Sequence, residues 1–270
     1  MATTRVGDID LEYDIEGSGP TLLMVMGMGG QASSWGQGFL DLLQHQFTTI
    51  RFSNRGTGRS GQSSEVTTIR AMAEDAAGLL QALEIESTHV MGISMGGMIS
   101  QELVLNHPQA VHGLVLGCTM CGQAHSLPVP LETIARFGAL PSMSRQERIK
   151  QFWAMTVTPE FERDHGDFLD NVVKTELESP TPEETMLRQM GAVVTFDTFD
   201  RLPQVRAPTL ILQGDRDLLV APGNADILHE RIPGSQVVPI TNASHCFFWE
   251  QPKQSAAAVI EFLSAVPSPA

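Results

Sequence analysis

The stretch that decides the fold runs from residue 89 to residue 103 and reads HVMGISMGGMISQEL. Before Ser94 lies a short apolar run that is typical of a buried strand, and after it lies the pattern of an amphipathic helix. Gly92 and Gly96 flank the serine two residues away on either side, where a Cβ atom would obstruct a sharp turn. This G-x-S-x-G pattern predicts a nucleophilic serine on a strained strand-to-helix turn.

The start of a helix suits the chemistry of such a serine. Helix N-termini carry partial positive charge, which favours the oxygen anion that forms when a hydroxyl group attacks a carbonyl group. A glycine-rich turn without a catalytic role is the alternative, and the pattern by itself does not exclude it. The position of Ser94 between a strand and a helix favours the nucleophile.

Apolar runs alternate with helical patterns along most of the remaining chain. Residues 6–20 alternate between apolar and polar types and predict a β-hairpin. Six further strands are expected at residues 22–26, 47–52, 89–93, 113–118, 209–213 and 236–240. Helices are expected at residues 34–45, 68–83, 97–106, 221–231 and 253–265. This alternation predicts an α/β fold whose eight-stranded, mostly parallel sheet is covered by helices on both faces.

The region from residue 124 to residue 194 interrupts this alternation. It contains several prolines and no convincing strand, and short helical patterns occur at residues 131–137, 144–155, 161–177 and 183–193. We interpret it as a helical cap that is inserted into one core domain. The expected division is a first core part at 1–123, the cap at 124–195 and a second core part at 196–270.

A serine hydroxyl needs a base to take its proton and a carboxylate to orient that base. His245 lies in a loop between the last expected strand and the last expected helix. Two carboxylates, Asp215 and Asp217, follow the expected strand at 209–213. The residues themselves leave the choice between these two open.

With its motifs in this order, the chain resembles the α/β-hydrolase superfamily over nearly its whole length, and in particular its serine esterases with a helical cap. In that family the nucleophile, the acid and the base follow one another along the chain. The family places the acid in a Gly-x-x-Asp pattern, which selects Asp217 over Asp215. The resemblance therefore implies a catalytic triad of Ser94, Asp217 and His245.

Two backbone N–H groups are expected to stabilise the oxyanion. One belongs to Met95, directly after the nucleophile. The other belongs to Met28 in the sequence MGMGG at residues 26–30, where the family usually has His-Gly-x-Gly. Met26 replaces that histidine, as in a subset of the family that includes polyketide methylesterases, so we expect apolar packing to hold the loop. The alternative is that these glycines only permit close packing.

Apolar side chains mark an expected substrate pocket. Met26 lies at the start of the predicted oxyanion loop, and Phe152, Trp153 and Met155 lie in the predicted cap. Methionine is flexible and suits an irregular apolar pocket. Ordinary core packing explains these residues equally well, so both interpretations stay open.

The sequence predicts neither a cofactor nor a metal site. The G-x-G at residues 56–58 lacks the spacing of a dinucleotide-binding loop, and it belongs to a family motif in which Ser53 replaces the usual aspartate. Cys118, Cys121 and Cys246 are expected to be buried thiols, because a zinc site needs more ligands in a suitable context.

Composition narrows the classes of partner. The 31 acidic and 17 basic residues give a net charge of −14, which disfavours nucleic acid and anionic membrane surfaces. The N-terminal residues lack the apolar stretch of a signal peptide, and three cysteines are too few for a disulfide framework. We therefore expect a cytoplasmic protein, and a homodimer is left open.

These features predict a serine carboxylesterase that hydrolyses small to medium, largely apolar esters through an acyl-enzyme. Its expected partner is a small-molecule ester. The same triad also serves lactone opening, C–C bond hydrolysis, perhydrolysis and acyl transfer. A ligand receptor that retains the fold and a slow triad is the alternative from another class.

Overall fold

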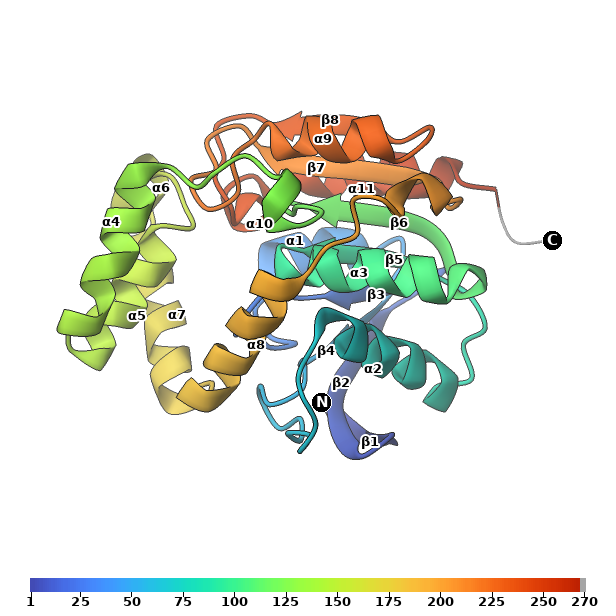
Figure 1. Cartoon of the computed structure of the whole chain (residues 1–270), viewed down its shortest axis with the longest axis horizontal. Coiled ribbons are helices and arrows are strands. Elements are labelled where there is room, and N and C mark those ends of the chain that lie inside the picture. The colour runs from blue at the N-terminus through green and yellow to red at the C-terminus, as the bar shows by residue number, and fades with distance from the viewer. Residues whose placement is uncertain (268–270) are drawn as a thin grey trace.

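The computed structural model describes residues 1–267. Its centre is an eight-stranded sheet with the strand order β1-β2-β4-β3-β5-β6-β7-β8 (Figure 1). The strands are β1 (Ala2–Val6), β2 (Ile9–Gly17), β3 (Thr21–Val25), β4 (Thr48–Phe52), β5 (Thr88–Ile93), β6 (Val111–Gly117), β7 (Thr209–Gly214) and β8 (Gln236–Ile240). The β1–β2 and β2–β4 pairs are antiparallel and the other neighbours are parallel. The predicted eight-stranded, mostly parallel sheet is confirmed.

Helices cover both faces of this sheet, as the sequence predicts. They are α1 (Gln37–Gln44), α2 (Ile69–Ala82), α3 (Met95–Asn106), α9 (Asn224–Arg231), α10 (Phe247–Glu250) and α11 (Pro252–Ala265). Because successive side chains of a strand point to opposite faces, Leu23 and Val25 enter one apolar core while Leu22 and Met24 enter another. Helices α2, α3 and α9 close the first core, and α1, α10 and α11 close the second.

Five further helices lie between β6 and β7, and we call them the inserted helices. They are α4 (Leu131–Ala139), α5 (Arg145–Ala154), α6 (Pro159–Asp164), α7 (Gly166–Glu178) and α8 (Glu183–Thr195). Figure 1 shows α4 to α7 gathered beside the sheet, with α8 leading back toward it. None of the helices in residues 1–267 combines the length and the apolar character that crossing a membrane requires.

One predicted helix, at residues 161–177, is two helices in the structure. α6 ends at Asp164 and α7 begins at Gly166, and His165 between them has non-helical backbone angles (φ −128°, ψ 35°). The rings of Phe161 and His165 pack with their centroids 4.4 Å apart and support this corner. Glycine is a poor residue for a helix interior, so the chain changes direction at this point.

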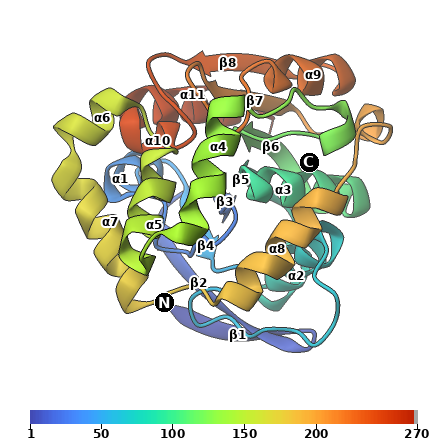
Figure 2. The same ribbon diagram turned by 60° about the vertical axis from the view of Figure 1, so that its left-hand side comes forward.

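The topology brings several loops to one edge of the sheet. Parallel strands end on the same side, so the loops after β3, β5, β6, β7 and β8 meet there. The inserted helices follow β6 and belong to the same side. Figure 2, which turns them to the front, shows α4, α5 and α8 in front of the central strands. Any site that these loops form therefore lies between the sheet edge and the inserted helices.

Candidate active site

Ser94 occupies the turn between β5 and α3 and carries backbone strain. Its φ of 56° lies in the left-handed region, which serine rarely adopts. A Cβ atom on Gly92 would lie 2.2 Å from the Gly96 carbonyl oxygen, and one on Gly96 would lie 2.0 Å from the Val25 carbonyl oxygen. Both glycines are therefore required for this turn, as the motif predicts.

Hydrogen bonds attach the serine turn to the end of β6. The Ser94 N–H donates to the carbonyl oxygen of Gly117 at 2.9 Å. The Thr119 hydroxyl donates to the carbonyl oxygen of Ser94 at 2.7 Å. These bonds hold the strained serine backbone from both sides.

His245, in the loop between β8 and α10, forms a hydrogen bond with Asp217, in the loop after β7. Its Nδ1 lies 2.9 Å from Asp217 Oδ2, and both side chains are buried. A buried carboxylate requires donors, and Asp217 has several. Gln213 Nε2 donates to Oδ2 at 3.0 Å, and the N–H groups of Leu219 and Val220 donate to Oδ1 at 2.8 and 3.0 Å. These donors hold the carboxylate facing the imidazole.

Asp215, the competing carboxylate, has a different environment. It is exposed, and its Oδ1 accepts a hydrogen bond from the Ala243 N–H at 3.3 Å. Asp215 therefore braces the loop that leads to His245, whereas Asp217 contacts the imidazole itself. The structure thus brings together the same acid and base that the family resemblance pairs.

Cys118, directly after β6, lies beside both the imidazole and the serine turn. Its Sγ is 4.0 Å from His245 Nε2, and its chain neighbours on both sides bond to Ser94. No hydrogen bond among residues 1–267 joins Ser94 Oγ to His245, and such contacts often tighten only when the substrate binds. From the sequence, Cys118 is predicted only as a buried thiol, and its position at the end of an expected parallel strand is the signal that places it at this site.

Cys118, Asp217 and His245 are also the one group in residues 1–267 whose ligand atoms lie close enough to share a metal ion, all within 4.8 Å. Burial, and then the charge of Asp217, raise the pKa of the Cys118 thiol well above its ordinary value. A metal-binding cysteine must lose its proton, so this thiol is a poor ligand. The donor set fits an acid–base pair beside a neutral thiol better than a metal centre.

The loop after β3, at residues 26–30, passes directly beside the serine. A Cβ atom on Gly27 would lie 3.1 Å from Ser94 Cβ and 3.7 Å from Ser94 Oγ. Met95, on the other side, is the first residue of α3, and the first N–H groups of a helix lack an acceptor within it. The backbone of this loop and the first turn of α3 therefore flank Ser94 on two sides.

The N–H groups within this loop have different partners. The Gly29 N–H donates to Gln189 Oε1 at 2.8 Å, and the Gly30 N–H donates to the Gly27 carbonyl oxygen at 3.1 Å. Within residues 1–267 the Met28 N–H has no protein acceptor. Met28 thus has the free donor that an oxyanion hole needs.

Packing and hydrogen bonds together hold the loop, which corrects the expectation of apolar packing alone. Met26 is buried, and a Cβ atom on Gly30 would lie 2.3 Å from its Cγ. Asn54 Nδ2 also donates to the Met26 carbonyl oxygen at 2.9 Å, and the Thr57 hydroxyl donates to that of Gly30 at 3.2 Å. The loop after β4 therefore provides part of the support that a histidine would give.

Comparison with known families decides the class of the protein. Residues 20–252 match the family model of the alpha/beta hydrolase fold. The chain belongs to the α/β-hydrolase family. This match includes the serine turn, the loop after β3 and the Asp217–His245 pair.

Several similar proteins are named as hydrolases. The putative carbamate hydrolase RutD of Azorhizobium caulinodans is 29% identical, with 92% of each chain aligned. A pimeloyl-[acyl-carrier protein] methyl ester esterase of Aeromonas hydrophila is 27% identical over 92% of this chain and 96% of that protein. The crystal structure of the enol-lactonase from Burkholderia xenovorans LB400 superposes with a TM-score of 0.85 over 97% of this chain and 100% of that one, at 22% identity. The last likeness shows the fold, and the relatives support a hydrolase.

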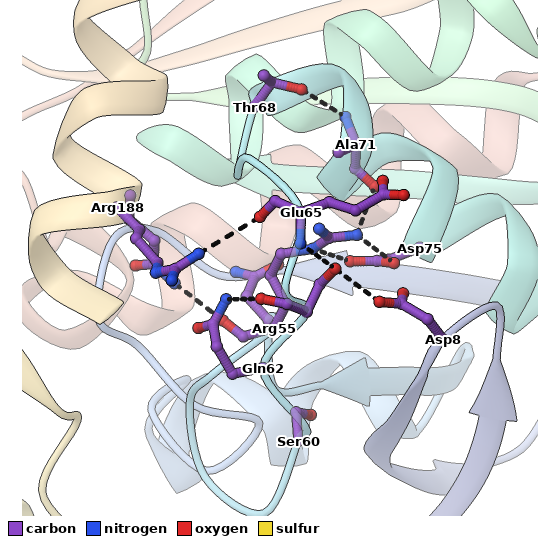
Figure 3. A network of polar contacts seen from close by, with 12 residues as sticks. Asp8, Arg55, Ser60, Gln62, Glu65, Thr68, Ala71, Asp75 and Arg188 are labelled. Atoms are coloured by element: carbon purple, nitrogen blue, oxygen red, sulfur yellow. Dashed lines mark hydrogen bonds and ion pairs between the residues drawn. The ribbon is translucent and has the colours of Figure 1, made fainter. Parts of the chain in front are cut away.

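A buried ion pair anchors the loop between β4 and α2 of this α/β-hydrolase (Figure 3). Arg55 donates to both carboxylate oxygens of Asp75, at 2.7 and 2.8 Å. Burial raises the pKa of Asp75 and outweighs the opposite effect of Arg55.

Ser53 donates to Glu12 Oε2 at 2.9 Å and accepts from the Ala32 N–H at 3.0 Å. Ser53 thus links three segments of the core although it replaces the usual aspartate.

Glu250 of α10 connects the inserted helices to the histidine loop. Its Oε1 accepts from the N–H and the hydroxyl of Thr158, at 2.7 and 2.6 Å. Its Oε2 accepts from the Ser244 N–H at 2.6 Å. Burial nevertheless raises the pKa of Glu250 above its ordinary value. The loop that carries His245 is therefore joined to the segment between α5 and α6.

The predicted pocket residues lie in or beside this junction and the oxyanion loop. Trp153 packs against Trp249 of α10 with ring centroids 5.1 Å apart, and Phe152 packs against Trp153 at 5.3 Å. Met155 is buried, as is Met26 at the start of the loop after β3. Their contact with a substrate stays a prediction.

Proposed function

We propose that this chain is a serine carboxylesterase that hydrolyses small to medium, largely apolar carboxylic esters through an acyl-enzyme. The observation that carries the proposal is the buried 2.9 Å hydrogen bond between His245 and Asp217 beside the strained Ser94 turn. Ser94 takes the role of nucleophile, His245 that of base and Asp217 that of orienting acid.

The hydrogen bond between Asp217 and one ring nitrogen decides which nitrogen of His245 can act as the base. An ionised carboxylate accepts hydrogen bonds, so His245 carries its proton on Nδ1 and has a free lone pair on Nε2. Nε2 accepts the Ser94 proton while the serine oxygen attacks the ester carbonyl carbon. The resulting imidazolium is stabilised by Asp217 and gives its proton to the leaving alcohol, which leaves the acyl group on Ser94.

Hydrolysis of the acyl-enzyme repeats these steps with water. His245 Nε2 takes a proton from water, the water oxygen attacks the acyl carbon, and Ser94 regains its proton as the acid departs. Both steps pass through an oxyanion, for which the N–H groups of Met28 and Met95 are the proposed donors. Loss of one such donor lowers the rate by about 10²–10³-fold in comparable sites.

Apolar residues favour an apolar substrate, and the name of a relative favours an ester bond. Met26, Phe152, Trp153 and Met155 offer apolar surface in or beside the oxyanion loop and the junction with α10. The relative from Aeromonas hydrophila is named a methyl ester esterase. We therefore favour a small-molecule carboxylic ester as the partner of this site.

The net charge and the thiols bear on other partners and on location. A charge of −14 disfavours nucleic acid and anionic membranes. Cys118, Cys121 and Cys246 are free and buried, which agrees with a reducing compartment. A cytoplasmic location is part of the proposal.

A carbamate is the second candidate substrate. The relative from Azorhizobium caulinodans is named a putative carbamate hydrolase. A carbamate offers Ser94 a carbonyl carbon, but its nitrogen donates electrons to that carbon and makes it less reactive than an ester. Parallel turnover assays with an ester and a carbamate of the same alcohol would rank the two, and lactones, acyl transfer and C–C hydrolysis belong in the same comparison.

The test measures turnover of p-nitrophenyl butyrate and covalent labelling by a fluorophosphonate probe. Wild-type protein is expected to do both, and Ser94→Ala neither. Ser100→Ala is the matched control, because Ser100 lies on the same helix and its hydroxyl donates to the Gly96 carbonyl oxygen at 2.8 Å. Wild-type protein that neither turns over the ester nor takes the label would refute the proposal, as would labelling that persists in Ser94→Ala.

A further inference from the structure

Gln189 is completely buried, although it lies on an inserted helix whose next residue reaches solvent. Its exposed fraction is 0%, whereas that of Met190 is 44%. A buried amide is costly unless its polar atoms have partners. Its Oε1 accepts a hydrogen bond from the Gly29 N–H at 2.8 Å, and its Nε2 lies 3.5 Å from the Arg55 carbonyl oxygen. Gln189 thus reaches from α8 into the loop beside Ser94.

The bond to Gly29 fixes part of the backbone around the proposed oxyanion donor. The Gly29 N–H belongs to the planar peptide unit that begins at Met28, so holding this N–H holds the whole plane. The plane that begins at Met26 is held by Asn54, at 2.9 Å from the Met26 carbonyl oxygen. The Met28 N–H belongs to the single peptide plane between these two, whose Gly27 carbonyl oxygen accepts from the Gly30 N–H at 3.1 Å within the loop. Its direction therefore depends on this internal bond together with the two supports from outside the loop.

The inserted segment also contacts Gly29 on its carbonyl side. The Thr181 hydroxyl donates to the Gly29 carbonyl oxygen at 2.9 Å. Gly29 has a φ of 72°, and a Cβ atom there would lie 2.7 Å from Met186 Sδ of α8. Only glycine permits both this conformation and this approach. Helix α8 and the segment before it therefore form hydrogen bonds with both the N–H and the carbonyl oxygen of Gly29.

We propose that Gln189 is a positioning residue for the oxyanion hole. It directs the Met28 N–H toward Ser94 and supplies a bracing hydrogen bond that the thioether of Met26 does not. The inference rests on the proposed function, because it assumes that the loop stabilises an oxyanion. It makes the placement of α8 part of transition-state stabilisation.

Arg188, the residue before Gln189, provides a matched control. Its Nη1 donates to the Glu65 carbonyl oxygen at 3.3 Å, which ties α8 to the loop before α2 (Figure 3). No contact of Arg188 with residues 26–30 occurs among the hydrogen bonds of the described chain. Arg188→Met therefore loosens the same helix without removing the bonds to Gly29.

The experiment compares wild type, Gln189→Met and Arg188→Met with p-nitrophenyl butyrate. Methionine matches the length of glutamine and forms no comparable hydrogen bond. Because the Met28 N–H remains but is poorly aimed, Gln189→Met should lower kcat by about tenfold, which is less than complete loss of a donor. KM should stay within about twofold, since the support acts in the transition state.

A transition-state analogue provides a readout that a purely structural role would not change. A trifluoromethyl propyl ketone adds to the serine and forms a hemiketal oxyanion in the same hole. Its inhibition constant should rise in Gln189→Met by the same factor as kcat falls. Arg188→Met should keep both values within about twofold of wild type, whatever its melting temperature.

The outcomes separate this inference from the proposed function. Unchanged kcat and inhibitor affinity in folded Gln189→Met would overturn the inference, and so would an equal loss in Arg188→Met. If Gln189→Met does not fold, Thr181→Val tests the other bond to Gly29 and should lower kcat by about threefold at constant KM. No change in Thr181→Val would then overturn the inference. Wild-type protein without turnover or fluorophosphonate labelling would instead refute the proposed function.

Discussion

Asp217→Asn replaces one oxygen of a buried carboxylate with an NH2 group, and the surrounding donors decide where that group goes. On the Oδ1 side lie the backbone N–H groups of Leu219 and Val220, at 2.8 and 3.0 Å. These groups can donate a hydrogen bond but cannot accept one. On the Oδ2 side lie His245 Nδ1 and Gln213 Nε2, at 2.9 and 3.0 Å. The imidazole can change its tautomer, and Gln213 Nε2 keeps its bonds to the carbonyl oxygens of Gly214 and Val220, both at 3.3 Å, so only its bond to residue 217 is lost. The NH2 group therefore goes to the imidazole side.

The size of the effect follows from these bonds and from the loss of the negative charge that stabilises the imidazolium, which is absent in either orientation. An NH2 group on the Oδ1 side would break two hydrogen bonds, at about 0.5–1.5 kcal/mol each. On the other side it would break only the bond from Gln213, so the difference of about 0.5–1.5 kcal/mol favours the imidazole side by about 2- to 13-fold. There the NH2 group donates to His245 Nδ1, so the ring proton moves to Nε2, which then cannot accept the Ser94 proton. The same change in a well-studied serine protease lowers kcat about 10⁴-fold, and we expect about 10³–10⁴ here.

The assay measures kcat with p-nitrophenyl butyrate, and Asp215→Asn is the matched control. Asp215 is exposed, and an amide oxygen can still accept its single hydrogen bond from the Ala243 N–H. Its kcat should stay within about twofold of wild type. Thermal unfolding verifies that both variants fold. A larger loss in Asp215→Asn than in Asp217→Asn, or more than about a tenth of wild-type kcat in Asp217→Asn, would refute the reasoning.

Two further substitutions test the site and the core. Gly27→Ala places a methyl group 3.1 Å from Ser94 Cβ and should lower kcat at least about tenfold. Gly191→Ala on α8 is the control and should leave kcat unchanged, because a Cβ atom there meets nothing within 4 Å. Equal effects of the two variants on kcat would contradict the geometry. Burial, and then the charge of His112, lower the pKa of His89 from 6.5 to about 4. Between these two pH values the folded state binds fewer protons than the unfolded state. The folded state therefore loses stability as the pH falls from 6.5 to about 4. Urea unfolding at neutral pH and at about pH 4.5 measures this loss of stability, which should be smaller in His89→Leu than in wild type. An equal loss in both proteins would show that His89 does not cause it.

The serine turn is predictable because its cause is local. The strained backbone of Ser94 requires glycine at two fixed positions, and both are visible in the sequence. The parallel strands are likewise visible as continuous apolar runs. These local signals are sufficient for the sheet, its helices and the position of the strained Ser94 turn.

The acid and the support of the oxyanion loop depend on contacts that no local pattern contains. Asp215 and Asp217 look alike in the sequence, and only the family resemblance separates them. In the structure, Asp217 accepts N–H groups from its own turn and thereby faces inward. Gln189 lies 160 residues after Gly29, so a helical pattern predicts α8 but not the polar contact it makes.

The break at His165 has another cause. The apolar pattern continues across residues 161–177, so periodicity predicts one helix. The Asp-His-Gly sequence at its start is a weak point, and packing of His165 on Phe161 turns the chain there. A local feature thus interrupts a pattern that is otherwise helical.

Two of the points that attach the inserted helices to the core lie close to the site: Thr158 bonds to Glu250, and Gln189 bonds to Gly29. This attachment has a consequence for protein engineering. A chimera that takes its inserted helices from a relative would keep every triad residue, yet it would turn over slowly unless the new segment supplied equivalent partners at both points. We expect that substitutions in the inserted helices that change the substrate range would also change the catalytic rate.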